Sequence, residues 1–422
     1  MNGFVVVTSV FLLYALVASR LDRLSITAPM VFVVAGTLLG QSFTDMIDIS
    51  LTSEPVLLLV ELTLTLLLFA DASTVRLREV RDDARLPMRL LLIGLPLTIA
   101  LGTVIGGLLF PAAGWAAAAL IASILAPTDS ALGLAIFTSR AVPVRIRRAL
   151  NVESGLNDGI VTPFLTLFLT VVVSEEAGTS GQWLLEAGKQ IGLALAVGVG
   201  VGVAGGTLLL VARRRGYASD LSEQLGIGSL ALLAYLGSVA IGGNGFIAAF
   251  VGGLAFGAST RGALHRPTEF TETVGLFASF LVWTVFGVLF LGPVLTTRID
   301  AAAIAYAVLS LTLVRMVPVA ISLVGTNLRR DTVAFMGWFG PRGLASVVFT
   351  LVAVETLHRS DAAFDALVEV ATWTILLSVV AHGLTAGPLA RIYGHRIQDA
   401  DGLPELLDAP EPRVRRRKIG AG

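Results

Sequence analysis

The sequence contains no cysteine and few charged residues. The lack of cysteine excludes disulfide bonds, thiol catalysis and iron–sulfur or cysteine–zinc centres, so any bound ion must use oxygen or nitrogen ligands. Charged residues make up only 14% of the chain, and 30 Lys and Arg balance 30 Asp and Glu. The chain therefore has no excess of positive charge that would favour nucleic acid as a partner.

Hydrophobic residues, by contrast, make up 55% of the 422 residues. The mean hydropathy of +0.84 is too high for a protein with a water-soluble surface. Charge-free runs such as 90–128 and 225–260 exceed the roughly 20 residues that span a bilayer as a helix. We therefore expect an all-α polytopic membrane protein.

Dividing these runs at Gly, Pro and short polar breaks predicts about thirteen transmembrane helices. Their approximate ranges are 3–19, 26–41, 55–70, 88–110, 114–137, 149–174, 188–212, 225–241, 245–258, 273–292, 301–324, 333–354 and 367–389. Loops after the odd-numbered segments carry 25 Lys and Arg, and the other loops carry three. The positive-inside rule then predicts a multi-pass protein of the cell (inner) membrane with its N-terminus outside and its C-terminus in the cytoplasm.

Matching features recur at a nearly constant spacing in the two halves of the chain. Pro127 and Pro341, each within an apolar segment, are 214 residues apart. We expect a transmembrane unit over 1–390, made of repeat one (about 3–174), a linking helix (about 188–212) and an inverted repeat two (about 225–389). Coincidental spacing in a long apolar chain is the alternative. The tail, 391–422, is short, polar and rich in Pro and Arg, and is expected to be disordered.

Charged residues within the predicted spans are candidates for function, because each costs about 2.5–3.5 kcal/mol at the bilayer centre. In Pro127-Thr128-Asp129 the proline removes a backbone donor, so the helix should open there. Backbone carbonyls such as that of Thr128 would then be available as cation ligands. Asp129 can compensate the positive ends of half-helices. Arg342, in the matching Gly-Pro-Arg-Gly break, can compensate their negative ends. A simple proline kink would not require either charge.

The stretch 151–158 carries a second group of polar residues. On a helix, Ser154 and Asp158 share one face, and Glu153 and Asn157 share the adjoining face. A hydroxyl and a carboxylate in line suit a dehydrated monovalent cation. Glu153 needs a counter-charge, and Arg315 is the best-placed candidate for a structural ion pair.

Three further polar residues allow more than one interpretation. Glu61 could approach the site through water or form a hydrogen bond between helices. Asp71, near the end of its span, is interpreted as an acid solvated at the membrane interface, and His382 as a packed polar group rather than a proton relay.

Together these motifs resemble the monovalent cation/proton antiporters, specifically the NhaP-like Asn-Asp branch. Asn157 and Asp158, in the sixth span of this chain, match the Asn-Asp pair of that branch. The resemblance covers nearly the whole membrane part, although the family commonly has proline where this chain has Ser130. It implies the NhaA- and NapA-like fold of two inverted six-helix repeats with crossed discontinuous helices, in a homodimer. It further implies that Asp158 binds Na⁺ and H⁺ in turn, with Thr128, Asp129 and Ser154 completing the site.

The resulting hypothesis is a secondary antiporter, not an enzyme, without a cofactor. It would exchange Na⁺, or Li⁺ or K⁺, for H⁺ by alternating access, electroneutrally and one for one. Two alternatives remain, a cation channel and an intramembrane aspartyl protease that uses Asp129 and Asp158 as a dyad. The Leu-Asn-Asp-Gly context of Asp158 does not match the Gly-x-Gly-Asp expected of such a protease.

Overall fold

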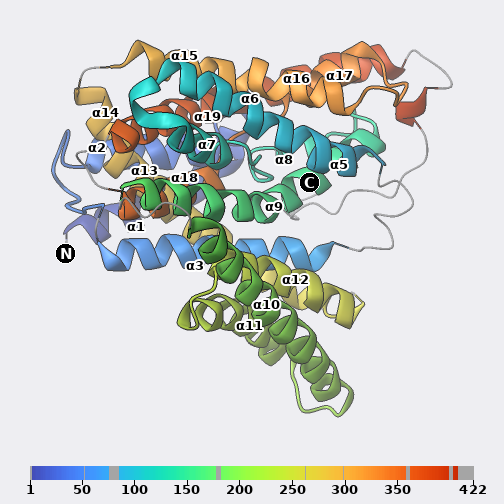
Figure 1. Cartoon of the computed structure of the whole chain (residues 1–422). Coiled ribbons are helices and arrows are strands. Elements are labelled where there is room, and N and C mark those ends of the chain that lie inside the picture. The colour runs from blue at the N-terminus through green and yellow to red at the C-terminus, as the bar shows by residue number, and fades with distance from the viewer. Residues whose placement is uncertain are drawn as a thin grey trace.

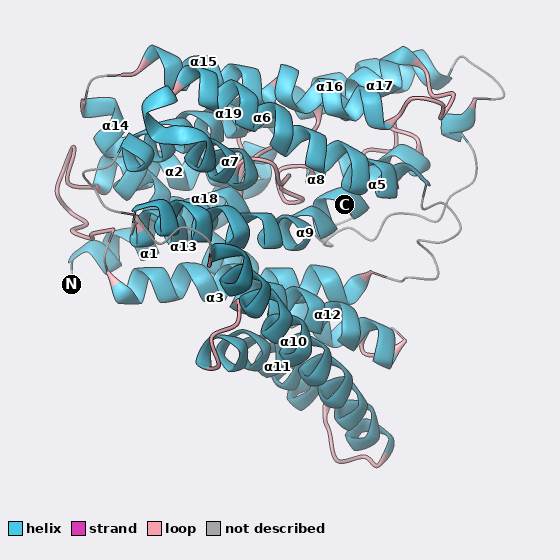
Figure 2. Ribbon diagram, viewed as in Figure 1, coloured by secondary structure: helices cyan, strands magenta, loops and turns pink. Residues whose placement is uncertain are grey.

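The computed structural model describes residues 2–51, 53–75, 85–176, 182–261, 263–297, 299–357, 362–398 and 403–406. Within these ranges the chain is built of helices joined by loops (Figure 2). Nine helices of the described part are long and apolar enough to cross a membrane, and four shorter apolar helices accompany them. They correspond one for one to the thirteen predicted segments, so the all-α polytopic prediction is confirmed.

The helices of the first half alternate between long continuous elements and short pieces. They are α1 (Asn2–Arg23), α2 (Ala28–Leu39), α3 (Glu54–Thr74), α5 (Arg85–Arg89), η1 (Leu90–Gly94), α6 (Leu95–Leu109), η2 (Pro111–Ala113), α7 (Gly114–Ile124), α8 (Leu134–Phe137) and α9 (Val144–Glu176).

The second half begins with the 32-residue helix α10. Its elements are α10 (Trp183–Arg214), α11 (Asp220–Ala240), α12 (Gly245–Thr260), α13 (His265–Phe286), η3 (Gly287–Leu291), α14 (Gly292–Thr296), α15 (Ala301–Leu311), α16 (Leu313–Ser322), α17 (Arg330–Trp338), α18 (Leu344–Thr356), α19 (Ala362–Gln398) and η4 (Pro404–Leu406).

The helices form two groups joined by a shared middle layer. In Figure 1, α3, α10, α11 and α12 lie together on one side, and α6, α7 and α15 to α17 lie on the other. Helices α9, α13 and α18 lie between the two groups. The largest apolar core includes residues of α3, α7, α13, α18 and α19.

Small residues allow α10 to pack closely on α12. A Cβ atom on Gly198 would lie 2.6 Å from the carbonyl oxygen of Ala248, and one on Gly202 would overlap the carbonyl oxygen of Gly252. Lipid supplies little hydrophobic drive between helices, so this close approach gains van der Waals contact that larger side chains would prevent.

Two predicted spans are interrupted, as their prolines indicate. Segment 114–137 consists of α7 and α8 separated by residues 125–133, and segment 333–354 consists of α17 and α18 separated by residues 339–343. Proline lacks the amide that an α-helix needs at this point and disfavours helical geometry at the residue before it. The second interruption is buried throughout, and the first is buried at residues 125–128.

The expectation of a disordered tail from residue 391 is wrong for its first part. Helix α19 continues to Gln398, and a short helical turn follows at Pro404–Leu406. Glu405 is fully buried, and its Oε1 accepts hydrogen bonds from the Arg329 amide and the Thr332 hydroxyl, both at 2.8 Å. A carboxylate at the start of α17 satisfies amide donors that the helix itself leaves free. Residues 399–402 and 407–422 lie outside the described part.

Candidate functional site

The two interrupted segments cross each other. The backbone amide of Asp129, in the first, donates to the carbonyl oxygen of Pro341, in the second, at 2.7 Å. The Ser346 hydroxyl, in the first turn of α18, donates to the Ile124 carbonyl at the end of α7, at 2.8 Å. Backbone groups freed in one segment are thus satisfied by the other, as the loss of hydrogen bonding in a buried segment requires.

The Asp129 carboxylate caps both segments. Its Oδ1 accepts the amides of Ala131 at 2.6 Å and Leu132 at 3.1 Å, and its Oδ2 accepts the amide of Leu344 at 2.8 Å. Leu344 is the first residue of α18, where the helix dipole is positive. This arrangement is the compensation of positive helix ends predicted for Asp129.

Arg342 performs the opposite role. Its guanidinium NH1 donates to the carbonyl oxygen of Ala126 and, at 3.2 Å, to that of Pro127, just beyond the end of α7. The side chain is fully buried. A cation at the carbonyl end of a helix is stabilised by the helix dipole, and this is the position expected for Arg342.

Two glycines allow the second segment to approach these charges. A Cβ atom on Gly343 would overlap the Asp129 carboxylate, and one on Gly340 would overlap the Arg315 guanidinium. Both positions therefore require a residue without a side chain.

Thr128, Ser154 and Asn157 form a hydrogen-bonded cluster. The Thr128 hydroxyl lies 2.9 Å from that of Ser154 and accepts the Asn157 side-chain amide at 2.7 Å. All three side chains are buried. The Asn157 Oδ1 is buried without a hydrogen-bond partner, which leaves one acceptor oxygen in the cluster. The structure thus joins the first interrupted segment to α9 through polar groups suited to a cation.

Glu153, on α9, and Arg315, on α16, form the predicted ion pair. The guanidinium donates from NH1 to Oε1 at 2.6 Å and from NH2 to Oε2 at 2.9 Å, and both side chains are 3% exposed. This two-point contact occupies both carboxylate oxygens, which fits the structural role predicted for Glu153.

Asp158 lines a small cavity together with Asp129 and Asp71. Its wall also includes Ser130, Ser279 and Trp283, together with apolar residues of α3, α13 and α18. Asp158 and Asp129 are therefore brought together as predicted. Thr128, Ser154 and Asn157 are not among the described residues that line this cavity, but Ser154 and Asn157 lie on α9 beside Asp158.

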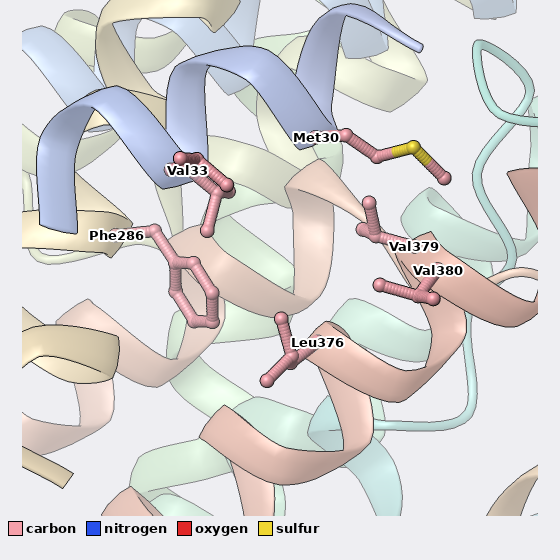
Figure 3. A pocket seen from close by; sticks show the side chains of 7 residues that line it. Met30, Val33, Phe286, Leu376, Val379 and Val380 are labelled. Atoms are coloured by element: carbon pink, nitrogen blue, oxygen red, sulfur yellow. The ribbon is translucent and has the colours of Figure 1, made fainter. Parts of the chain in front are cut away.

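Glu61 lies elsewhere. It forms a side-chain hydrogen bond with Tyr235 of α11, which agrees with the interhelical alternative and not with direct participation at the cavity. A second crevice, shown in Figure 3, lies between α2, α13 and α19 and is lined by apolar side chains such as Val33, Phe286 and Val379. It offers no ligand to an ion.

Sequence reasoning missed the place of Asp71. The residue was interpreted as an interface acid, yet it lines the same cavity as Asp158. Its position within an otherwise charge-free run was the available signal. Ser130, which differs from the common family residue, also contributes to the wall of the cavity.

Known relatives have similar sequences over most of the chain. The K(+)/H(+) antiporter NhaP2 of Shewanella sp. (strain MR-4) is 23% identical over 381 residues, which cover 88% of this chain and 63% of the relative. The Na(+)/H(+) antiporter ApNhaP of Aphanothece halophytica is 24% identical over 367 residues, covering 82% and 66%. The chain thus spans less than two thirds of the length of these relatives.

A solved structure has the same fold. The sodium proton antiporter MjNhaP1 from Methanocaldococcus jannaschii matches with a TM-score of 0.73 at 19% identity, covering 92% of this chain and 97% of that one. The family model for the transmembrane sodium/hydrogen exchanger matches residues 7–392. This family match covers more than half of the chain, so the chain belongs to the sodium/hydrogen exchanger family.

Proposed function

We propose that this protein exchanges a monovalent cation, Na⁺ or K⁺, for H⁺ across the cell membrane, with Asp158 as the group that binds the two in turn. The observation that carries the proposal is the cavity at the crossing of the interrupted helices, where Asp158 and Asp129 meet. The printed names of the relatives, which include both K(+)/H(+) and Na(+)/H(+) antiporters, support it.

The hydrogen bonds of Asp129 define its role in the proposed site. Asp129 accepts three backbone amides from both interrupted segments, and a proton on either oxygen would face an amide donor. Asp129 therefore suits a permanently acceptor role that holds the crossing together and contributes charge to the cavity. Asp158, on the neighbouring helix α9, is proposed as the carboxylate that binds the cation and the proton in turn.

Competition for one carboxylate provides the coupling. If the site crosses between the two faces only when neutralised, each movement with a cation must be matched by a return with a proton. One cation then replaces one proton, so the exchange is electroneutral. Thr128, Ser154 and Asn157 would supply neutral oxygens next to Asp158, and no cofactor is needed.

The hydrogen bonds of Asp129 and the size of the cavity argue against the protease and the channel alternatives. An aspartyl dyad requires two carboxylates that share a proton, whereas the Asp129 oxygens are both engaged by amides. A channel needs a continuous path, whereas the cavity that holds Asp129 and Asp158 is small.

The orientation and domain organisation are part of the proposal. Arg89 donates to the carbonyls of Ser322 and Val324, and Arg145 donates to that of Pro404. Each contact joins two regions that the basic-residue count assigns to the cytoplasm. This supports an N-terminus outside, a C-terminus inside, two inverted repeats within residues 1–390, and, by family resemblance, a homodimer.

Purified protein in proteoliposomes with an internal pH dye tests the proposal. Addition of Na⁺, K⁺ or Li⁺ should move protons without net current, and Asp158→Asn should abolish this movement while the protein remains folded. Asp365→Asn, at an exposed position near the start of α19, is the matched control and should behave like the wild type. Cation-driven proton flux retained by Asp158→Asn, or cation flux without proton movement, would refute the assignment.

A further inference from the structure

Two polar residues of α19, Ser378 and His382, lie one turn apart within an otherwise apolar stretch. Both are buried, with exposed fractions of 0% and 1%. Neither lines the cavity or caps an end of α7 or α18. Buried polar groups in a membrane helix need a partner, and the partners of these two lie on the second interrupted segment.

The contacts form a continuous path. The Arg342 backbone amide donates to the Ser378 hydroxyl at 2.6 Å, and this hydroxyl lies 3.2 Å from His382 Nδ1. Nδ1 also lies 2.9 Å from the Ser378 carbonyl. On the other side of the ring, Nε2 lies 2.8 Å from the Trp338 carbonyl oxygen. In the tautomer with the proton on Nε2, the ring donates to the Trp338 carbonyl and Nδ1 accepts a hydrogen bond from the Ser378 hydroxyl, which completes the path.

The two ends of this path are the partners of a missing helix bond. In a continuous α-helix the amide of residue 342 would donate directly to the carbonyl of residue 338. Here Pro341 and the surrounding residues are not helical, and the two side chains of α19 bridge the gap between that amide and that carbonyl. The Trp338 carbonyl also accepts the Gly340 amide at 2.9 Å.

The residue before the interruption is held by α19 a second time. The Trp338 indole Nε1 donates to the Thr385 hydroxyl at 3.0 Å, and the indole packs on the His382 ring with centroids 5.2 Å apart. Helix α19 therefore fixes both the entry to the interruption, at Trp338, and its far side, at Arg342.

The backbone of 341–342 in turn positions the proposed exchange site. The Pro341 carbonyl accepts the Asp129 amide, and the Arg342 guanidinium donates to the Ala126 and Pro127 carbonyls. We propose that Ser378 and His382 are positioning residues, a hydrogen-bonded bridge that replaces the missing helix bond and holds the two interrupted segments in register for ion binding. The transport part of this inference rests on the proposed exchange activity, whereas its structural part does not.

The first test is hydrogen–deuterium exchange of peptides covering residues 339–347 in purified protein. Ser378→Ala and His382→Ala should each accelerate exchange of this segment about tenfold or more, because the amide of Arg342 loses its acceptor or that acceptor loses its anchor. Thr372→Val is the matched control, since the buried Thr372 hydroxyl donates to the carbonyl of Val368 in its own helix. Unchanged protection in both bridge variants would overturn the proposal, whether or not the protein transports ions.

The second test separates binding from turnover in proteoliposomes. Misplacement of a binding group by about 1 Å can cost up to 100-fold in rate, so His382→Ala should raise the apparent KM for the cation about tenfold with a smaller change in maximal rate. His382→Gln, which keeps a donor for the Trp338 carbonyl, should recover part of this loss. The double variant Ser378→Ala/His382→Ala should raise the KM no further than the more damaging single variant does, because both substitutions interrupt the same hydrogen-bonded bridge.

Additive increases in KM in the double variant, or a wild-type KM in both Ser378→Ala and His382→Ala, would overturn the positioning role. Ser378→Ala is the smaller perturbation and decides the question if His382→Ala fails to fold. If the wild-type protein shows no cation/proton exchange, the proposed function is refuted. The hydrogen–deuterium measurement would still decide whether the Ser378–His382 bridge exists.

Discussion

Arg315 and Glu153, 162 residues apart in the chain, meet through two parallel hydrogen bonds of 2.6 and 2.9 Å. The pair ties α16 to α9 directly beside the residues proposed to bind the ion. Because both side chains are buried, each charge depends on the other for compensation.

Removal of one partner of this pair should destabilise the protein strongly. Glu153→Gln leaves Arg315 buried without a counter-charge, at a cost of about 3–5 kcal/mol. The thermal denaturation midpoint in detergent should fall by several degrees or more. Arg329→Gln, which breaks a half-exposed 3.4 Å pair with Asp331, should change it little. Equal midpoints for both variants would show that the buried pair is not structural.

A methyl group at position 343 should disrupt the crossing. The added Cβ of Gly343→Ala would collide with the Asp129 carboxylate and displace it from the Leu344 amide. Exchange activity should fall by at least about tenfold, equivalent to ~1.4 kcal/mol. Gly387→Ala, where a Cβ would meet nothing within 4 Å, should retain the activity of the wild type. Full activity of Gly343→Ala would contradict the observed approach.

The Thr128 hydroxyl should matter for the cation more than for the proton. Thr128→Val keeps the shape but removes the group that joins Ser154 and Asn157. The apparent KM for the cation should rise about tenfold, with the folded yield preserved. Thr170→Val removes a hydroxyl of α9 that donates to the carbonyl of Thr166 in the same helix, and the KM of this variant should not change.

Competition at one carboxylate fixes the direction of the pH dependence. As pH falls, protons occupy more of the Asp158 sites, so the apparent KM for the cation should rise while the maximal rate at saturating cation stays nearly constant. Initial rates measured over a cation series at several pH values, equal on both sides of the membrane, will show this. A maximal rate that decreases as the pH is lowered, with an unchanged KM for the cation, would indicate that the cation and the proton bind at separate sites.

Glu405 should stabilise the N-terminal end of α17. Glu405→Ala removes an acceptor for the Arg329 amide and the Thr332 hydroxyl, and a lost helix cap costs about 1 kcal/mol. The expected result is a lower denaturation midpoint with exchange kinetics close to those of the wild type. Asp331→Ala, which removes a partly exposed acid from the same first turn, should have a smaller effect.

Patterns local to the sequence predicted much of this molecule. Hydropathy located the thirteen apolar segments, and Pro127 and Pro341 located the two interruptions, because a missing amide acts on its own helix. The Glu153–Arg315 pair was predictable as well, since a buried charge demands a partner and few candidates exist within the membrane.

What escaped prediction depends on distant contacts. Nothing in the neighbourhood of His382 reveals that its ring faces the Trp338 carbonyl, and nothing near Glu405 reveals Arg329 as its partner. The predicted start of the sixth span at 149 also falls short of α9, which begins at Val144. Hydropathy detects only the apolar part of a helix that continues beyond the membrane.

The uninterrupted helix α9 has a mechanical consequence. Its 33 residues form a rod about 50 Å long, and Glu153, Ser154, Asn157 and Asp158 all project from a single stretch of it. A slide of that rod along its axis displaces the four side chains together, so a cation bound to Ser154, Asn157 and Asp158 would keep these ligands during the movement.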